Sequence, residues 1–186
     1  MRDELLASNP AAKIKRLGVP RTEAHYLSIA EVASLLEAVK DSRYAPLLRP
    51  LVATGLRRGE ALALRWSDVD LTNGLLRVRG TLLRVNGHMV ISEPKTERSR
   101  GDVSLSPTTV ALLRSVKASQ AVERLKAASI WVETGLVFTT ESGTAVDPRN
   151  ALRAIRTAAE ALGMSSLGLH TLRQSATHML AAGVPR

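Results

Sequence analysis

The sequence of 186 residues has no cysteine, few aromatic residues and no long apolar run. Without cysteine it can form no disulfide and no thiolate metal site, and its four scattered histidines lack the spacing of metal ligands. No apolar stretch approaches the ~20 residues that span a bilayer, and the N-terminus lacks the apolar segment of a signal peptide. We therefore expect a protein that needs no metal or cofactor and does not enter a membrane.

Acidic residues are fewer than basic residues in this sequence. The chain has 26 Lys and Arg against 17 Asp and Glu, which gives a net charge of +9 and a pI near 10.8. This excess favours a polyanionic partner such as nucleic acid, although a basic surface without a special role has the same composition. The length suits one well-buried domain. We expect a cytoplasmic, nucleoid-associated protein.

Helix signals dominate the chain after a polar, proline-punctuated stretch over residues 1–25, which we interpret as a linker. Ser28 and Glu31 form a capping box that begins a helix through about residue 40. A second helix over 44–54 ends at Gly55, a residue suited to a helix C-terminus. Further helices are predicted from Ser106-Pro107 to about 128, from Asp147-Pro148 to Gly163, and from about 170 to Gly183.

Between the second and third helices the apolar pattern changes to a period of two. Leu76 and Val78 alternate with arginines after an Asn-Gly turn at 73–74, and a second Asn-Gly turn at 86–87 precedes a strand at 89–91. A third strand is predicted at about 102–105. The expected fold class is α+β, mainly α with a small three-stranded antiparallel β-sheet.

Two arginine motifs lie more than a hundred residues apart, Thr54–Glu60 with Arg57 and His170–Arg173. Two guanidinium groups brought together by a fold can hold several phosphate oxygens, because each presents a rigid fork of donors. His170 and Arg173 are three residues apart in the first turn of a predicted helix, whose N-terminus favours an anion. The motifs predict a phosphate clamp, and with it chemistry at a phosphodiester.

The segment 53–70 resembles the first motif of the tyrosine recombinase (phage integrase) family, 94–96 resembles its lysine element, and 170–173 resembles its second motif. The resemblance covers residues 26–186. It implies an integrase catalytic-domain-like fold in which Arg57, Lys95, His170 and Arg173 are catalytic. Lys95 would protonate the leaving 5′ oxygen, and His170 would assist proton transfer or hold a phosphate oxygen.

Complete members of the family cut DNA through a 3′-phosphotyrosyl intermediate without metal or ATP. The nucleophilic tyrosine follows the second motif in that family, whereas the tyrosines here, Tyr26 and Tyr44, both precede Arg57. We therefore expect 26–186 to be a catalytic domain truncated before its nucleophile, C-terminally incomplete and inactive alone. Residues 1–25 would be a linker or the tail of an absent N-terminal core-binding domain.

The expected partners are double-stranded DNA and either further copies of this chain or a second recombinase protomer. Whether the chain is itself an enzyme stays open. One alternative is a non-catalytic DNA-binding module that occupies recombination sites. Another is a helix-turn-helix regulator, in which Arg57, Lys95 and Arg173 need not converge. We also expect Glu60 and Asp68 to orient the arginines, and the last helix to expose Met179, Leu180 or Val184.

Overall fold

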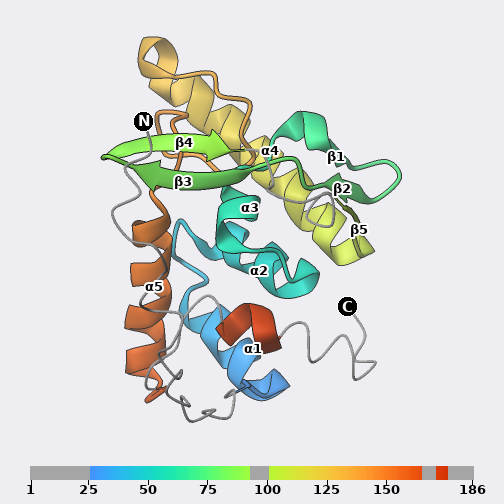
Figure 1. Ribbon diagram of the computed structural model, residues 1–186, viewed down its shortest axis with the longest axis vertical. Helices are drawn as coiled ribbons and strands as arrows, with labels where there is room; N and C mark the ends of the chain where they lie inside the picture. Colours follow the sequence, from blue (N-terminus) through green and yellow to red (C-terminus); the bar gives the residue numbers. More distant parts are fainter. Residues whose placement is uncertain (1–25, 93–100, 165–170, 176–186) are drawn as a thin grey trace, which may run out of the picture.

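The computed structural model describes residues 26–92, 101–164 and 171–175. The five labelled α-helices surround a central core, and an unlabelled helical turn over 171–175, red in Figure 1, lies beside the first of them. Their bounds are α1 Ile29–Ala38, α2 Ala45–Thr54, α3 Arg58–Leu62, α4 Pro107–Ala127 and α5 Pro148–Ala161. Short 3₁₀ turns cover η2 Trp66–Asp68 and η4 Ala128–Ile130.

The helix boundaries follow the capping residues predicted from the sequence. Ser28 Oγ accepts from the Glu31 amide at 3.2 Å, and Glu31 Oε2 accepts from the Ser28 amide at 2.7 Å, which completes the capping box of α1. Gly55 ends α2 with φ 65°, a conformation that glycine adopts without steric cost. Ser106 and Asp147 cap α4 and α5. Of the helix predicted over 170–183, residues 171–175 are helical and the others lie outside the described residues.

The strands form two antiparallel sheets. The three-stranded sheet contains β1 Val69–Asp70, β2 Leu75–Arg77 and β5 Asp102–Ser104, with β2 in the middle. A separate hairpin contains β3 Thr81–Val85 and β4 His88–Ser92. The small three-stranded sheet is confirmed, but its membership differs, because the strand predicted at 89–91 pairs within the hairpin and β1 takes the third place. The cause is the turn at Asn86 and Gly87, whose positive φ angles fold β4 back onto β3.

Asp70 closes the turn between β1 and β2. Its carboxylate accepts from the amides of Thr72 and Asn73 at 3.0 and 2.9 Å, and from the Asn73 side chain at 2.7 Å. These hydrogen bonds, the Asn73 amide first, lower the pKa of Asp70 below its ordinary value, since they favour the charged form.

Two contacts fix the β3–β4 hairpin to the helices. It packs on α3 at Gly59, where an added Cβ would lie 2.6 Å from Thr81 Cγ2 and 2.9 Å from the Leu82 carbonyl oxygen. Arg84 of β3 also forms an ion pair with Asp147, the N-cap of α5. The helix that follows Arg57 is therefore held between α2 and the hairpin.

The core joins the helices to both sheets. Its fully buried side chains come from α1, α2, α3, α4, α5, β2, the extended segment at 136–138 and the 171–175 helix. The largest apolar ones are Leu35, Leu48, Leu62, Leu76, Leu113, Val137, Ile155 and Leu172. In the part of the chain that the structure describes, no helix combines the length and the apolarity that crossing a membrane requires.

Candidate phosphate-binding site

Arg57 stands at the N-cap of α3, in the tight connection after α2. The Glu60 carboxylate, 9% exposed, accepts from the Arg57 amide at 2.7 Å and from Arg57 Nη1 at 2.7 Å. More than half of the Arg57 side chain, 55%, remains exposed. A buried carboxylate thus fixes both the backbone and one nitrogen of Arg57, and the rest of the guanidinium stays accessible to an anion.

Arg173 reaches the first motif from the far end of the chain. It lies on the 171–175 helix, whose Leu172 is 2% exposed in the core. Arg173 Nε donates to the Gly55 carbonyl at 2.8 Å, a bond between residues 118 apart in sequence. Because Gly55 is two residues before Arg57, the fold brings the two arginine motifs together.

The other two predicted site residues, Lys95 and His170, lie outside the described residues, so their place at the site stays a prediction, as do the catalytic roles of all four. The expectation for Glu60 agrees with its contacts to Arg57. Asp68 instead forms an ion pair with Arg79 at 3.2 Å. Within the described ranges, no group of three or more His, Cys, Asp or Glu side chains could hold a metal ion.

A row of arginines on α5 was not predicted from the sequence. Arg149, Arg153 and Arg156 are exposed, and their spacing of four and then three residues puts them on one face of the helix. The start of this helix is tied to the first motif, because Arg58 Nη1 donates to the Pro148 carbonyl at 3.3 Å. The i, i+4, i+7 spacing is the signal that would have found this basic face.

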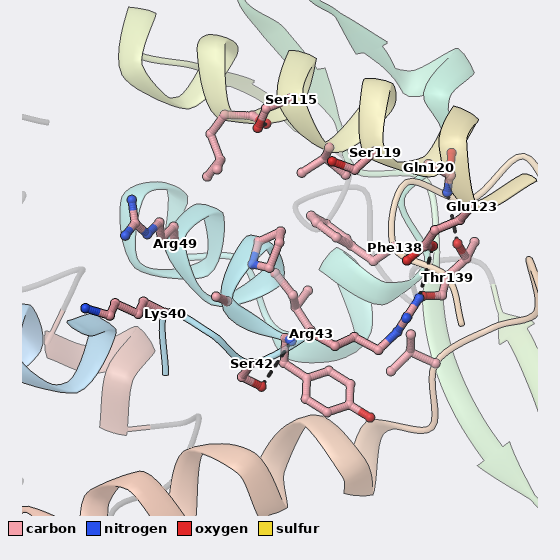
Figure 2. Close-up of a pocket in the computed structure, with 17 residues that line it drawn as sticks. Lys40, Ser42, Arg43, Arg49, Ser115, Ser119, Gln120, Glu123, Phe138 and Thr139 are labelled. Atoms are coloured by element: carbon pink, nitrogen blue, oxygen red, sulfur yellow. Dashed lines mark hydrogen bonds and ion pairs between the residues drawn. The ribbon is translucent and has the colours of Figure 1, made fainter. Parts of the chain in front are cut away.

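A cavity of about 350 Å³ lies at the other end of α2. Figure 2 shows Arg43 extending along it toward Thr139 and Glu123, and Arg43 pairs with Glu123 at 3.2 Å. The cavity is lined by the first half of α2 together with α4 and residues around Phe138. Since Gly55 and Arg57 follow the opposite end of α2, the cavity is separate from the two arginine motifs.

The sequence profile described as the phage integrase family matches residues 25–186. This chain belongs to the phage integrase family. The integrase chain is 33% identical over 202 residues to a protein named "Tyrosine recombinase XerC-like" from Caldanaerobacter subterraneus subsp. tengcongensis, across 97% of this chain and 51% of that protein. The chain therefore spans about half the length of this curated relative.

Solved integrase structures share the fold. The Tn1549 transposon integrase, solved in complex with transposon right end DNA, has a TM-score of 0.74 at 20% identity, over 91% of this chain and 57% of that one. A lambda integrase dimer bound to a COC′ core site has a TM-score of 0.61 at 17% identity, over 94% of this chain and 45% of that one. The predicted integrase-like α+β fold is confirmed.

Proposed function

We propose that this integrase chain is the phosphate-binding part of a tyrosine recombinase catalytic domain, and that it binds duplex DNA through Arg57, Lys95, His170 and Arg173. The observation that carries the proposal is the hydrogen bond from Arg173 Nε to the Gly55 carbonyl. This bond joins Arg173 of the second motif to the backbone two residues before Arg57 of the first motif. A helix-turn-helix regulator would not require this convergence.

The two arginines suit the charge that develops at a phosphodiester under attack. Negative charge grows on the non-bridging oxygens, and fixed cations stabilise it without reorganising during the reaction. Glu60 holds Arg57 in place, and the Gly55 carbonyl holds Arg173. The family resemblance supplies the remaining roles, in which Lys95 protonates the leaving 5′ oxygen and His170 assists proton transfer.

Neither tyrosine of this chain is placed to act as the nucleophile. Tyr44 is the N-cap of α2, about 16 Å along the helix from Gly55 at about 1.5 Å per residue. Tyr26 is next to Leu27, whose amide contacts Ser175, and a residue two places after Arg173 points to nearly the opposite side of a helix. In this proposal, neither Tyr26 nor Tyr44 cleaves DNA. The proposal includes a second recombinase protomer bound to the same DNA. It also includes association of the protein with the nucleoid.

DNA binding by charge-matched variants tests the clamp. Arg57→Gln and Arg173→Gln should each weaken binding to a fluorescent duplex by about ten- to a hundredfold, since a lost charge-assisted contact is worth about 1.5 to 3 kcal/mol. Arg124→Gln removes the same charge from the exposed end of α4, where Arg124 pairs with Glu133 at 2.9 Å, and should change affinity less than twofold. Equal losses in all three variants would show that only net charge matters and would reject the clamp.

A further inference from the structure

A buried serine lies two residues after Arg173. Ser175 is 0% exposed, and both functions of its hydroxyl are used. Its Oγ accepts from the Leu27 amide at 2.8 Å and donates to the Thr171 carbonyl at 2.9 Å. The first of these bonds joins residues 148 apart in sequence. It attaches the helix that carries Arg173 to the segment just before α1.

Tertiary contacts decide the position of the helical residues 171–175, because most helical stability in proteins comes from packing rather than from intrinsic propensity. Their position depends on what each side chain contacts. Leu172 is packed in the core, Arg173 bonds the Gly55 carbonyl, and Ser175 bonds Leu27. Successive residues of a helix point 100° apart, so these contacts hold the turn from different sides.

The Leu27 end of this bond is itself fixed. Leu27 is 4% exposed in the core, and the capping box of Ser28 and Glu31 follows at once. A buried amide without an acceptor is costly, so the Leu27 N–H and the Ser175 hydroxyl hold each other in place. The segment 26–28 is thus a rigid support for the Arg173 helix.

We propose that Ser175 is a positioning residue for Arg173. It holds the 171–175 helix where the guanidinium meets the Gly55 carbonyl, and through Leu27 it couples the phosphate clamp to whatever precedes α1. Displacement of the segment 26–28 would then withdraw Arg173 from Arg57. The part of this inference that concerns DNA rests on the proposed function, whereas the part that concerns the position of Arg173 does not.

Nitrogen-15 NMR of the Arg173 Nε–H tests the position directly. The resonance is assigned by its loss in Arg173→Lys, which has no Nε–H of the guanidinium type. In Ser175→Ala it should move toward the shift of solvent-exposed arginines, and its exchange with water should quicken about tenfold, as for loss of one buried hydrogen bond. Ser106→Ala removes the N-cap hydroxyl of α4, which accepts from the Thr109 amide, and should leave the resonance unchanged.

An unchanged Arg173 resonance in a folded Ser175→Ala protein would overturn the proposal. If that variant does not fold, Ser175→Cys replaces it, since the thiol is close in size and a weaker acceptor. The cysteine variant should shift the resonance in the same direction by a smaller amount. No shift in a folded Ser175→Cys protein would equally overturn the proposal.

A double-mutant cycle measured on DNA affinity tests whether Ser175 affects DNA binding through Arg173. If Ser175 acts through Arg173, Ser175→Ala combined with Arg173→Gln should bind within about twofold of Arg173→Gln alone, because coupled sites are not additive. Ser106→Ala with Arg173→Gln should show the product of the single effects. If the double variant Ser175→Ala with Arg173→Gln also shows the product of its two single effects on affinity, the positioning role of Ser175 is overturned. Failure of the wild type to bind DNA would overturn the proposed function, and the NMR result would still decide the role of Ser175.

Discussion

At the scale of single residues, Gly59 sets the distance between the first arginine motif and the hairpin. A methyl group at this position would meet the Leu82 carbonyl oxygen at 2.9 Å, and backbone cannot turn aside as a side chain can. Gly59→Ala should lower the free energy of unfolding by about 1 to 3 kcal/mol, the cost of overpacking, when measured by urea denaturation.

Gly101 provides the matched control for this substitution. Among the described residues an added Cβ there meets no atom within 4 Å, so Gly101→Ala should be close to neutral. Equal losses in the two variants would show that contact with β3 does not decide the effect of Gly59→Ala.

Sequence spacing was enough to predict the residues whose partners lie nearby. Glu60 is three residues from Arg57, and Gly55 directly follows the last residue of α2, so local rules identified both. The bond from the Leu27 amide to Ser175 gave no such signal, because the two residues are 148 apart in sequence. A serine in an apolar helix can face solvent or a buried amide, and only the tertiary fold decides which.

At the scale of elements, Asp147 joins α5 to the hairpin and has two separable roles. Its side chain accepts from the Arg149 amide at 2.8 Å as an N-cap, and it pairs with Arg84 of β3. Asp147→Ala loses both and should cost about 1 to 2 kcal/mol of stability. Asp147→Asn keeps the cap and should cost about 0.2 to 1 kcal/mol, the usual value of a partly exposed ion pair.

Thermal unfolding in low and high salt separates these roles. The difference in melting temperature between wild type and Asp147→Asn should narrow in high salt, because salt screens the ion pair. The difference in melting temperature between Asp147→Asn and Asp147→Ala should be the same in low and high salt. A salt-independent effect of Asp147→Asn would show that the pair with Arg84 does not hold the hairpin.

The helices were easier to predict than the sheets for a physical reason. Ser28, Ser106 and Asp147 each mark a helix start through a bond to an amide within three residues. Strand signals between 73 and 105 located β2, β4 and β5 but neither β1 nor β3, and they did not show which strands pair. Pairing of β2 with β5, across the hairpin between them, depends on contacts that no local pattern encodes.

At the scale of the whole molecule, a net charge of +9 should govern DNA affinity. If the chain neutralises about 4 to 6 phosphates, the logarithm of the association constant should fall against the logarithm of salt concentration with a slope of roughly −4 to −5. Fluorescence anisotropy with one duplex at several salt concentrations measures this slope. Binding that is insensitive to salt would argue against a phosphate-dominated interface.

Residues 1–186 alone should also form no covalent bond with DNA, because neither of their two tyrosines lies in line with the proposed site. Alignment of a nucleophile supplies several kcal/mol of the barrier, and neither Tyr26 nor Tyr44 has that alignment in the proposed site. Incubation with nicked duplexes followed by denaturing electrophoresis should show no adduct. An adduct that disappears in Tyr26→Phe or Tyr44→Phe would contradict the proposal.

The bonds that join the two ends of the fold have a consequence for the order in which it forms. Arg173 to Gly55 and Leu27 to Ser175 close loops of 118 and 148 residues, and contacts so distant in sequence form slowly. A chain emerging from the ribosome can build α1, α2 and the hairpin early, while Arg57 is still without its partner. Newly made chains would therefore be unable to bind phosphate with both arginines until residues 171–175 have been translated and have reached Gly55.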